Sequence, residues 1–285
     1  MLTDDFNVSI SSKHGEKGIN WRDVFDCAEE ILVDASDDLK ILWKQIEQKG
    51  TRSAFFETWS SFWFSSPNLD HTRRVKLAGR MLVSATAIAT LDQLVDRTSS
   101  GLSVSLEREL RYYAVLWDEL ACELFPYFEP WGAHLPLWLS PRHGAEESFN
   151  HRDLLLKKNP FYPSALRTYF FGLDEIRVIS EDFAVALGLL DDAADVREDY
   201  LVGNPNALFS DSRNFIFVGD ISEVRRNILR SNRIGTAISE ARQLLDGVER
   251  FLKRNDRLLF AETVWHIESS LDNYSELCVA RLIMN

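Results

Sequence analysis

Residues that form disulfides or interrupt helices are scarce in this 285-residue sequence, which has 3 cysteines, 13 glycines and 8 prolines. Cys27, Cys122 and Cys278 are far apart and odd in number, which excludes a disulfide framework and indicates reduced thiols. Sustained alternation of apolar and polar residues is also absent, which argues against a β-rich fold. The sequence therefore predicts a mainly helical protein.

Long hydrophobic runs and basic blocks are missing as well. No stretch approaches about 18 uninterrupted apolar residues, so no membrane span is expected. The acidic N-terminus, Met-Leu-Thr-Asp-Asp-Phe, lacks the apolar core of a signal peptide. The net charge is −12, from 44 acidic and 32 basic residues, and no Lys/Arg-rich block interrupts it, which argues against a nucleic-acid partner. These absences indicate a cytoplasmic protein.

Apolar residues are plentiful, and they include 18 Phe, 8 Trp and 7 Tyr that can fill a core or line a cavity. Residues 1–19 are polar and unpatterned, and we expect a flexible arm there. Residues 20–285 are expected to form one all-α domain, a bundle of about ten helices around a central cavity. The proline-rich stretch 126–144 is expected to be an ordered aromatic loop or lid with one helical turn. Apolar spacing, caps and breakers place the helices at about 20–48, 52–64, 70–99, 104–125, 146–158, 163–172, 175–202, 220–231, 233–254 and 256–283.

The helix at 175–202 is apolar along most of its length and acidic near its end. Asp191, Asp195 and Asp199 stand at i, i+4 and i+8, so one continuous helix would project them from one face across about 12 Å. Like charges at this spacing repel each other. Three short carboxylates on one apolar helix therefore favour a hard divalent cation opposite them, Mg²⁺ or Mn²⁺. The alternative is a solvated acidic helix end.

A second acidic pair lies about a hundred residues earlier. Asp92 and Asp96, at i and i+4, end another apolar helix that is rich in small residues. Two such helices can clamp metal ions between them. We therefore expect the carboxyl groups of Asp92 and Asp96 to face those of Asp191 and Asp195 across a cavity.

With both motifs in view, the chain resembles the class I isoprenoid synthases. Asp191-Asp192-Ala193-Ala194-Asp195 is similar to the second Asp-Asp-x-x-Asp motif of the trans-prenyltransferases, and Gly203-Asn204-Pro205 lies where those enzymes have Gly-Lys-Pro. The segment Asp195-Val-Arg-Glu-Asp199 resembles the Asp-Val-x-Glu-Asp motif of squalene and phytoene synthases. Asp92-Gln-Leu-Val-Asp96 fits the first motif of that second branch. The overall likeness is to small bacterial class IB-type terpene synthases.

The resemblance implies a cluster of Mg²⁺ ions, three in most relatives, that grips the diphosphate of an allylic prenyl substrate. Mn²⁺ is an alternative metal. The aspartates would be the catalytic metal ligands, with Asp192 either a ligand or a support for the ligands; the full set is Asp92, Asp96, Asp191, Asp192, Asp195 and Asp199. The residues implied as contacts to the substrate diphosphate are Arg97, Lys158, Arg197, Asn206 and Arg213.

Three functions remain open at this point. A terpene synthase would ionise one allylic diphosphate and release a hydrocarbon or alcohol plus pyrophosphate. A prenyltransferase would use the same site to elongate a chain, condense two substrates or prenylate an unusual acceptor. The N-terminal isopentenyl diphosphate motif of the elongating enzymes has no match, and Asn204 replaces their lysine, which favours the terpene synthase. A noncatalytic relative that binds a lipid or a partner is the third reading, and a homodimer is compatible with all three.

Overall fold

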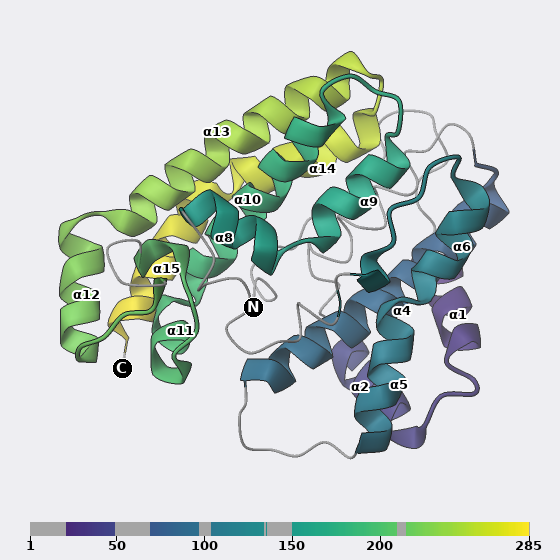
Figure 1. Ribbon diagram of the computed structural model, residues 1–285, viewed down its shortest axis with the longest axis horizontal. Coiled ribbons are helices and arrows are strands. Elements are labelled where there is room, and N and C mark those ends of the chain that lie inside the picture. Colours follow the sequence, from purple (N-terminus) through teal and green to yellow (C-terminus); the bar gives the residue numbers. More distant parts are fainter. Residues whose placement is uncertain are drawn as a thin grey trace. The chain divides into compact units, whose positions relative to one another are not determined.

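The computed structural model describes residues 21–48, 69–96, 104–133, 135, 150–209 and 215–284. Over these ranges all regular secondary structure is helical and no strand occurs (Figure 1). The all-α class is therefore confirmed. The arm at 1–19 and the helix at 52–64 are predictions that lie outside the described residues. No described helix combines the length and the apolar character that a membrane span requires.

The helices belong to two compact units. The first unit is built mainly from α1 (Trp21–Ile31), α2 (Asp37–Gln48), α4 (His71–Asp96), α5 (Val104–Ala114) and α6 (Leu116–Leu124). The second is built mainly from α8 (His151–Lys158), α9 (Phe161–Tyr169), α10 (Ile176–Ala194), α11 (Val196–Val202), η3 (Ala207–Phe209), α12 (Ile221–Arg230), α13 (Arg233–Arg254) and α15 (Leu271–Ile283). Helix α14 (Leu258–Ser269) gives its first half to the first unit and its second half to the other.

Helix α4 is the centre of the first unit and packs against α1, α5 and α6. It is buried on several sides, which explains its many small residues. Ser84 is fully buried, and its hydroxyl donates to the Tyr113 carbonyl at 2.8 Å and accepts from the Trp117 N–H at 3.3 Å. Because this hydroxyl is satisfied on both sides, it ties α4 to the helices beside it without a desolvation penalty.

Helix α10 has the same place in the second unit, where α8, α9 and α15 pack around it (Figure 1). Its core side chains run from Phe183 to Ala194. Gly188 is the point of closest approach to α8, because a Cβ atom there would meet Asn159 Nδ2 at 2.8 Å and Leu155 Cδ2 at 2.9 Å. The missing side chain therefore lets α8 lie directly against α10.

Four helices that the sequence predicted as continuous are divided, and the described residues contain more α-helices than the ten expected. The divisions fall before Asp37, at Val115, at Asp195 and at Ser270. The first has a clear local cause. Ser36 caps α2 with its hydroxyl, which accepts from the Leu39 N–H at 3.3 Å, while its own N–H donates to Glu109 Oε1 at 2.6 Å.

Other boundaries agree with the sequence to within a few residues. Helices α12 and α13 lie where they were predicted, and α9 begins two residues early, with Pro163 in its first turn. Helix α8 begins after Asn150, whose side chain accepts from the Asp153 N–H at 2.9 Å. The described part of the aromatic loop contains a helical turn, η1 (Trp131–Ala133), and residues 134 and 136–149 lie outside the described residues.

Candidate functional site

The predicted acidic helix changes direction at its central aspartate. Asp195 ends α10 and begins α11, with φ −104° and ψ 12°, outside the α-helical range. Hydrogen bonds still cross the break, from the Asp195 N–H to the Asp191 carbonyl at 3.0 Å and from the Asp199 N–H to the Asp195 carbonyl at 2.8 Å. Asp191 and Asp195 therefore keep their one-turn spacing, whereas Asp199 belongs to a separate short helix.

Asp191 and Asp195 form a half-buried pair of carboxylates at the end of α10. Burial, followed by the nearby Asp195 carboxylate, raises the pKa of Asp191 to about 6. Both causes disfavour the charged form, so two ionised groups here are stable only when positive charge lies close by. The pair can therefore accept a cation with a gain in free energy.

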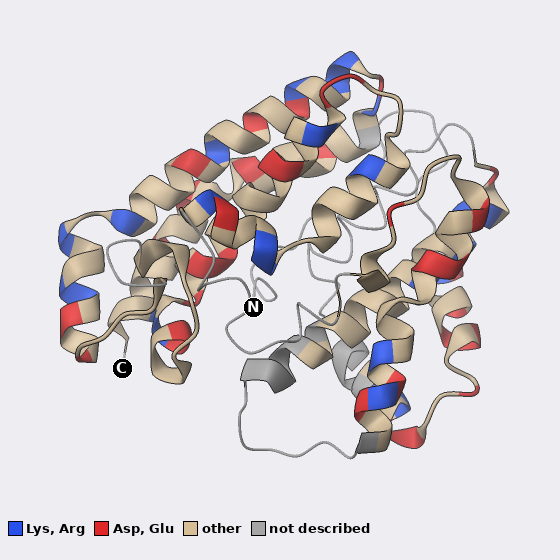
Figure 2. Cartoon of the chain, viewed as in Figure 1, with Lys and Arg blue, Asp and Glu red and all other residues tan. Residues whose placement is uncertain are grey.

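Asp192 is turned to the other side of α10 and is only 1% exposed. Its Oδ1 accepts from Lys158 Nζ at 2.5 Å, and its Oδ2 accepts from the Ala207 N–H at 2.6 Å. Figure 2 shows the basic end of α8, which carries Lys158, beside the acidic residues of α10. Both oxygens of Asp192 are thus engaged within the protein, and the side chain joins α8 and η3 to α10.

Lys158 brings a positive charge to this cluster, because it forms a salt bridge with Asp192. Its Nζ also donates to the Pro205 carbonyl at 3.1 Å, and its side chain is 24% exposed. Burial lowers the pKa of Lys158, but the carboxylates of Asp192, Asp199 and Asp191 outweigh burial and raise the pKa above its ordinary value. The ammonium group therefore stays protonated and partly balances the aspartates.

The chain returns to α10 after α11 through a turn that the sequence correctly placed. Gly203 ends α11 with φ +75°, a left-handed conformation that favours glycine, and the Asn204 N–H donates to the Asp199 carbonyl at 2.8 Å. Asn206 is then fully buried beneath α10. Its Nδ2 donates both to the Asp192 carbonyl and to Asp199 Oδ2, at 2.7 Å each.

Asp199 is half-buried and is held by this amide. Burial raises the pKa of Asp199 well above its ordinary value, although Lys158 and the Asn206 hydrogen bond act in the opposite direction. Asn206 was expected to contact the substrate diphosphate. Its Oδ1 accepts from the Leu208 N–H at 2.9 Å, so both ends of the amide are engaged within the protein.

Of the remaining predicted site residues, only the side chain of Arg197 is described. Arg197 is the second residue of α11, after the break at Asp195, and its Nε is buried without a hydrogen-bond partner among the described atoms. Asp92 and Asp96 occupy the last turns of α4 in the first unit, but their side chains lie outside the described residues, as do Arg97 and Arg213. The expectation that the two aspartate pairs face each other stays a prediction.

Tyr274 is a neighbour of the cluster that the sequence did not reveal. Its hydroxyl donates to the Leu190 carbonyl at 2.9 Å, one residue before Asp191, and the side chain is 5% exposed. Burial, with smaller effects from Cys278, Asp191 and Asp195, raises the pKa of Tyr274. The tyrosine thus remains a hydrogen-bond donor. The sequence could not indicate this contact, because it joins two residues 84 positions apart and depends on how α15 packs against α10.

The donor set fits a hard cation only in part. Asp191 and Asp195 offer carboxylate oxygens, the donors that Mg²⁺ prefers, whereas Asp192 is fully engaged and Asp199 is held by Asn206. Within the described ranges, no three His, Cys, Asp or Glu side chains are grouped so that they could hold a metal ion by themselves. Asp191 and Asp195 therefore do not form a complete metal site with the other described side chains.

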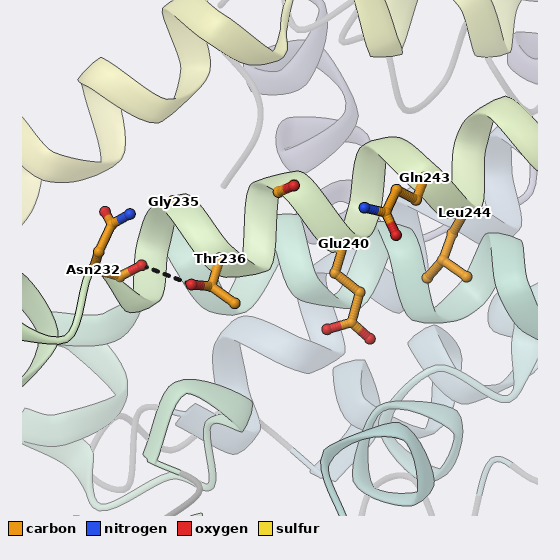
Figure 3. A pocket seen from close by; sticks show the side chains of 7 residues that line it. Asn232, Gly235, Thr236, Glu240, Gln243 and Leu244 are labelled. Carbon is orange, nitrogen blue, oxygen red and sulfur yellow. Dashed lines mark hydrogen bonds between the residues drawn. The ribbon is translucent and has the colours of Figure 1, made fainter.

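A groove of about 740 Å³ runs along one face of α13 (Figure 3). None of these aspartates lines it. Glu240, on its wall, pairs with His151 of α8 at 3.0 Å, and Thr236 donates to the Asn232 carbonyl at 3.1 Å. The described residues that line it are Asn232, Gly235, Thr236, Ser239, Glu240, Gln243 and Leu244. None of them is a predicted site residue.

Comparison of the chain with protein-family models, with curated proteins and with solved structures gives no match. The family resemblance therefore rests on the sequence motifs alone.

Proposed function

We propose that this protein is a Mg²⁺-dependent terpene synthase of the class I isoprenoid synthase type. It would ionise an allylic prenyl diphosphate and release a hydrocarbon or alcohol plus pyrophosphate, in a cavity enclosed by the helical bundle. The observation that carries the proposal is the pair Asp191 and Asp195, which lie one turn apart and half-buried at the end of an apolar helix, where burial and the Asp195 carboxylate raise the pKa of Asp191. Such a pair gains most from a bound divalent cation.

The aspartates have distinct roles in this proposal. Asp191 and Asp195 would hold the metal, Asp199 would join them from α11, and Asp92 and Asp96 are the further ligands that the sequence predicts. Bound Mg²⁺, or Mn²⁺ in its place, would supply Lewis-acid stabilisation of the diphosphate leaving group. Asp192 supports the site from behind, because both of its oxygens are engaged by Lys158 and Ala207.

The protein's own charges would assist the departure of the leaving group. Lys158 places a permanent positive charge beside the aspartates, and it lowers the pKa of both Asp191 and Asp199. Preorganised charge in a partly buried site acts more strongly than the same charge in water. Arg97, Arg197 and Arg213 remain candidate diphosphate contacts. The aromatic residues would shield the carbocation from water.

Two experiments test the proposal. Purified protein is incubated with C10, C15, C20 and C25 allylic diphosphates plus Mg²⁺, and one of them alone should give a terpene and pyrophosphate. A chelator should stop turnover. A product longer than its substrate, formed only when a second diphosphate or another acceptor is added, would instead identify a prenyltransferase. No turnover of any diphosphate, with or without an acceptor, would favour the noncatalytic relative.

The metal assignment is tested with two single substitutions on the same stretch. Asp195→Ala should abolish turnover and leave the helical circular dichroism spectrum unchanged, because the Asp195 side chain is half-buried and does not belong to the apolar core. Glu198→Ala is the matched control, since it removes an exposed carboxylate three residues later. Unchanged product formation by Asp195→Ala would contradict the assignment. Equal loss of activity in both variants would show that general acidity, and not this ligand, matters.

A further inference from the structure

The break at Asp195 raises the question of what fixes Asp199. In one continuous helix, the backbone alone would place Asp199 above Asp195. Helix α11 is only seven residues long, too short to be stable by itself, and Val196 is its one buried side chain. Helix α11 packs against α10, α12 and α15, so its placement is decided by tertiary contacts.

Asn206 supplies the contact that reaches the Asp199 carboxylate itself. One nitrogen, Nδ2, donates both to Asp199 Oδ2 and to the backbone carbonyl of Asp192, which lies in the last turn of α10. Its oxygen accepts from the Leu208 N–H. The Asn206 backbone N–H donates to the Phe215 carbonyl at 2.9 Å, so the residue is anchored on both sides.

We infer that Asn206 is a positioning residue, which fixes the carboxylate of Asp199 against the last turn of α10 across the break at Asp195. It acts through Asp199, because both ends of its amide are engaged within the protein. The consequence for metal binding rests on the proposed function, because it takes Asp199 to be a ligand. The orienting role itself does not depend on that function.

The chemistry of the position requires an amide. The side chain must offer two N–H donors from one atom and an acceptor from the other. An aspartate of the same size would keep the acceptor for the Leu208 N–H, but it would bring a carboxylate oxygen against Asp199 and against the Asp192 carbonyl. A serine is too short to span both partners. Asn206→Asp therefore reverses two attractive contacts while it preserves the volume.

The first test uses the metal-free protein and measures amide hydrogen exchange over residues 196–202. In Asn206→Asp, these amides should exchange at least about tenfold faster than in the wild type, because a hydrogen bond to a charged group is replaced by repulsion. Ser84→Ala is the control, since Ser84 is equally buried and also bridges neighbouring helices. It should leave exchange in α11 at the wild-type rate. If Asn206→Asp does not fold, Asn206→Ser gives the same comparison without the added charge.

The second test separates orientation from metal binding. The double variant Asn206→Asp/Asp199→Asn exchanges donor and acceptor at the contact between these two side chains only, and the repulsion from the Asp192 carbonyl remains. Exchange in α11 should therefore be slower than in Asn206→Asp alone, although faster than in the wild type. Titration with Mn²⁺, followed by electron paramagnetic resonance, should show weaker binding for Asn206→Asp and for the double variant than for the wild type and Ser84→Ala. This pattern assigns the orienting role to residue 206 and the ligand role to Asp199.

Each contrary result has one meaning. Wild-type exchange in α11 of both Asn206 variants would overturn the positioning role, whatever the protein catalyses. Equally fast exchange in α11 of Ser84→Ala would overturn it too, because any buried polar loss would then have the same effect. If α11 responds as expected but the wild type binds no Mn²⁺, the proposed function fails and the positioning role stands.

Discussion

Removal of the Lys158 ammonium group should destabilise the protein strongly, because it isolates a buried negative charge. Asp192 is 1% exposed, and Lys158 donates to its Oδ1 at 2.5 Å. In Lys158→Met, the apolar stem is kept and the charge is lost. The Asp192 carboxylate then still accepts the hydrogen bond from the Ala207 N–H, but it has lost the charge of Lys158.

The size of the effect follows from burial. Loss of one partner of a buried ion pair costs about 3–5 kcal/mol. The lower end applies here, because the Lys158 side chain is 24% exposed and water can reach the vacated position. We expect Lys158→Met to lower the free energy of unfolding by about 3 kcal/mol. For 285 residues, at about 2.1 cal/mol/K of unfolding entropy per residue, that corresponds to roughly 5 °C in melting temperature.

A double-mutant cycle isolates the charge. In an Asp192→Asn background no carboxylate remains to be stranded, so Lys158→Met should cost about 1 kcal/mol, the value of an ordinary hydrogen bond. Urea unfolding at pH 7, followed by circular dichroism, gives the four free energies. An equal cost of Lys158→Met in both backgrounds would refute the reasoning, since Lys158 would then stabilise the protein without neutralising Asp192.

Two further predictions concern local energetics. Burial raises the pKa of Asp118 from 3.8 to about 6, despite hydrogen bonds from the N–H groups of Gly132 and Trp131. The folded protein therefore binds this proton more tightly than the unfolded chain does. Relative to Asp118→Asn, its free energy of unfolding, measured in urea titrations at each pH, should rise by about 1.4 kcal/mol from pH 7.5 to pH 5. The same pH dependence of that free energy in both proteins would contradict this. Gly188→Ala should destabilise by about 1–3 kcal/mol, since its Cβ would meet Asn159 Nδ2 at 2.8 Å. Gly247→Ala, with nothing within 4 Å of its Cβ, should stabilise by about 0.5–1 kcal/mol in thermal melts, and the reverse order would show that α8 is free to move aside.

Local signals in the sequence were sufficient for several features. Apolar periodicity predicted the helical class and placed α12 and α13, because a helix that buries one face must repeat its apolar residues every three to four positions. The end of the acidic stretch at Gly203 was also predictable, since a glycine after the last periodic residue can adopt the left-handed conformation that ends a helix. The aspartates themselves, and their one-turn spacing in α10, are read directly from the sequence.

Long-range packing decided the rest. The sequence could not indicate the break at Asp195, because all residues from 191 to 199 tolerate a helix, and the contacts that favour two helices come from segments far along the chain. The different fates of Asp191 and Asp192 have the same origin. Adjacent residues point about 100° apart on a helix. Asp192 is the buried one because Lys158 of α8 and Ala207, which follows the turn, pack against its side of α10. The sequence alone therefore determined the number and spacing of the carboxylates at residues 191–199, whereas tertiary contacts decided which hydrogen bonds Asp192 and Asp199 accept.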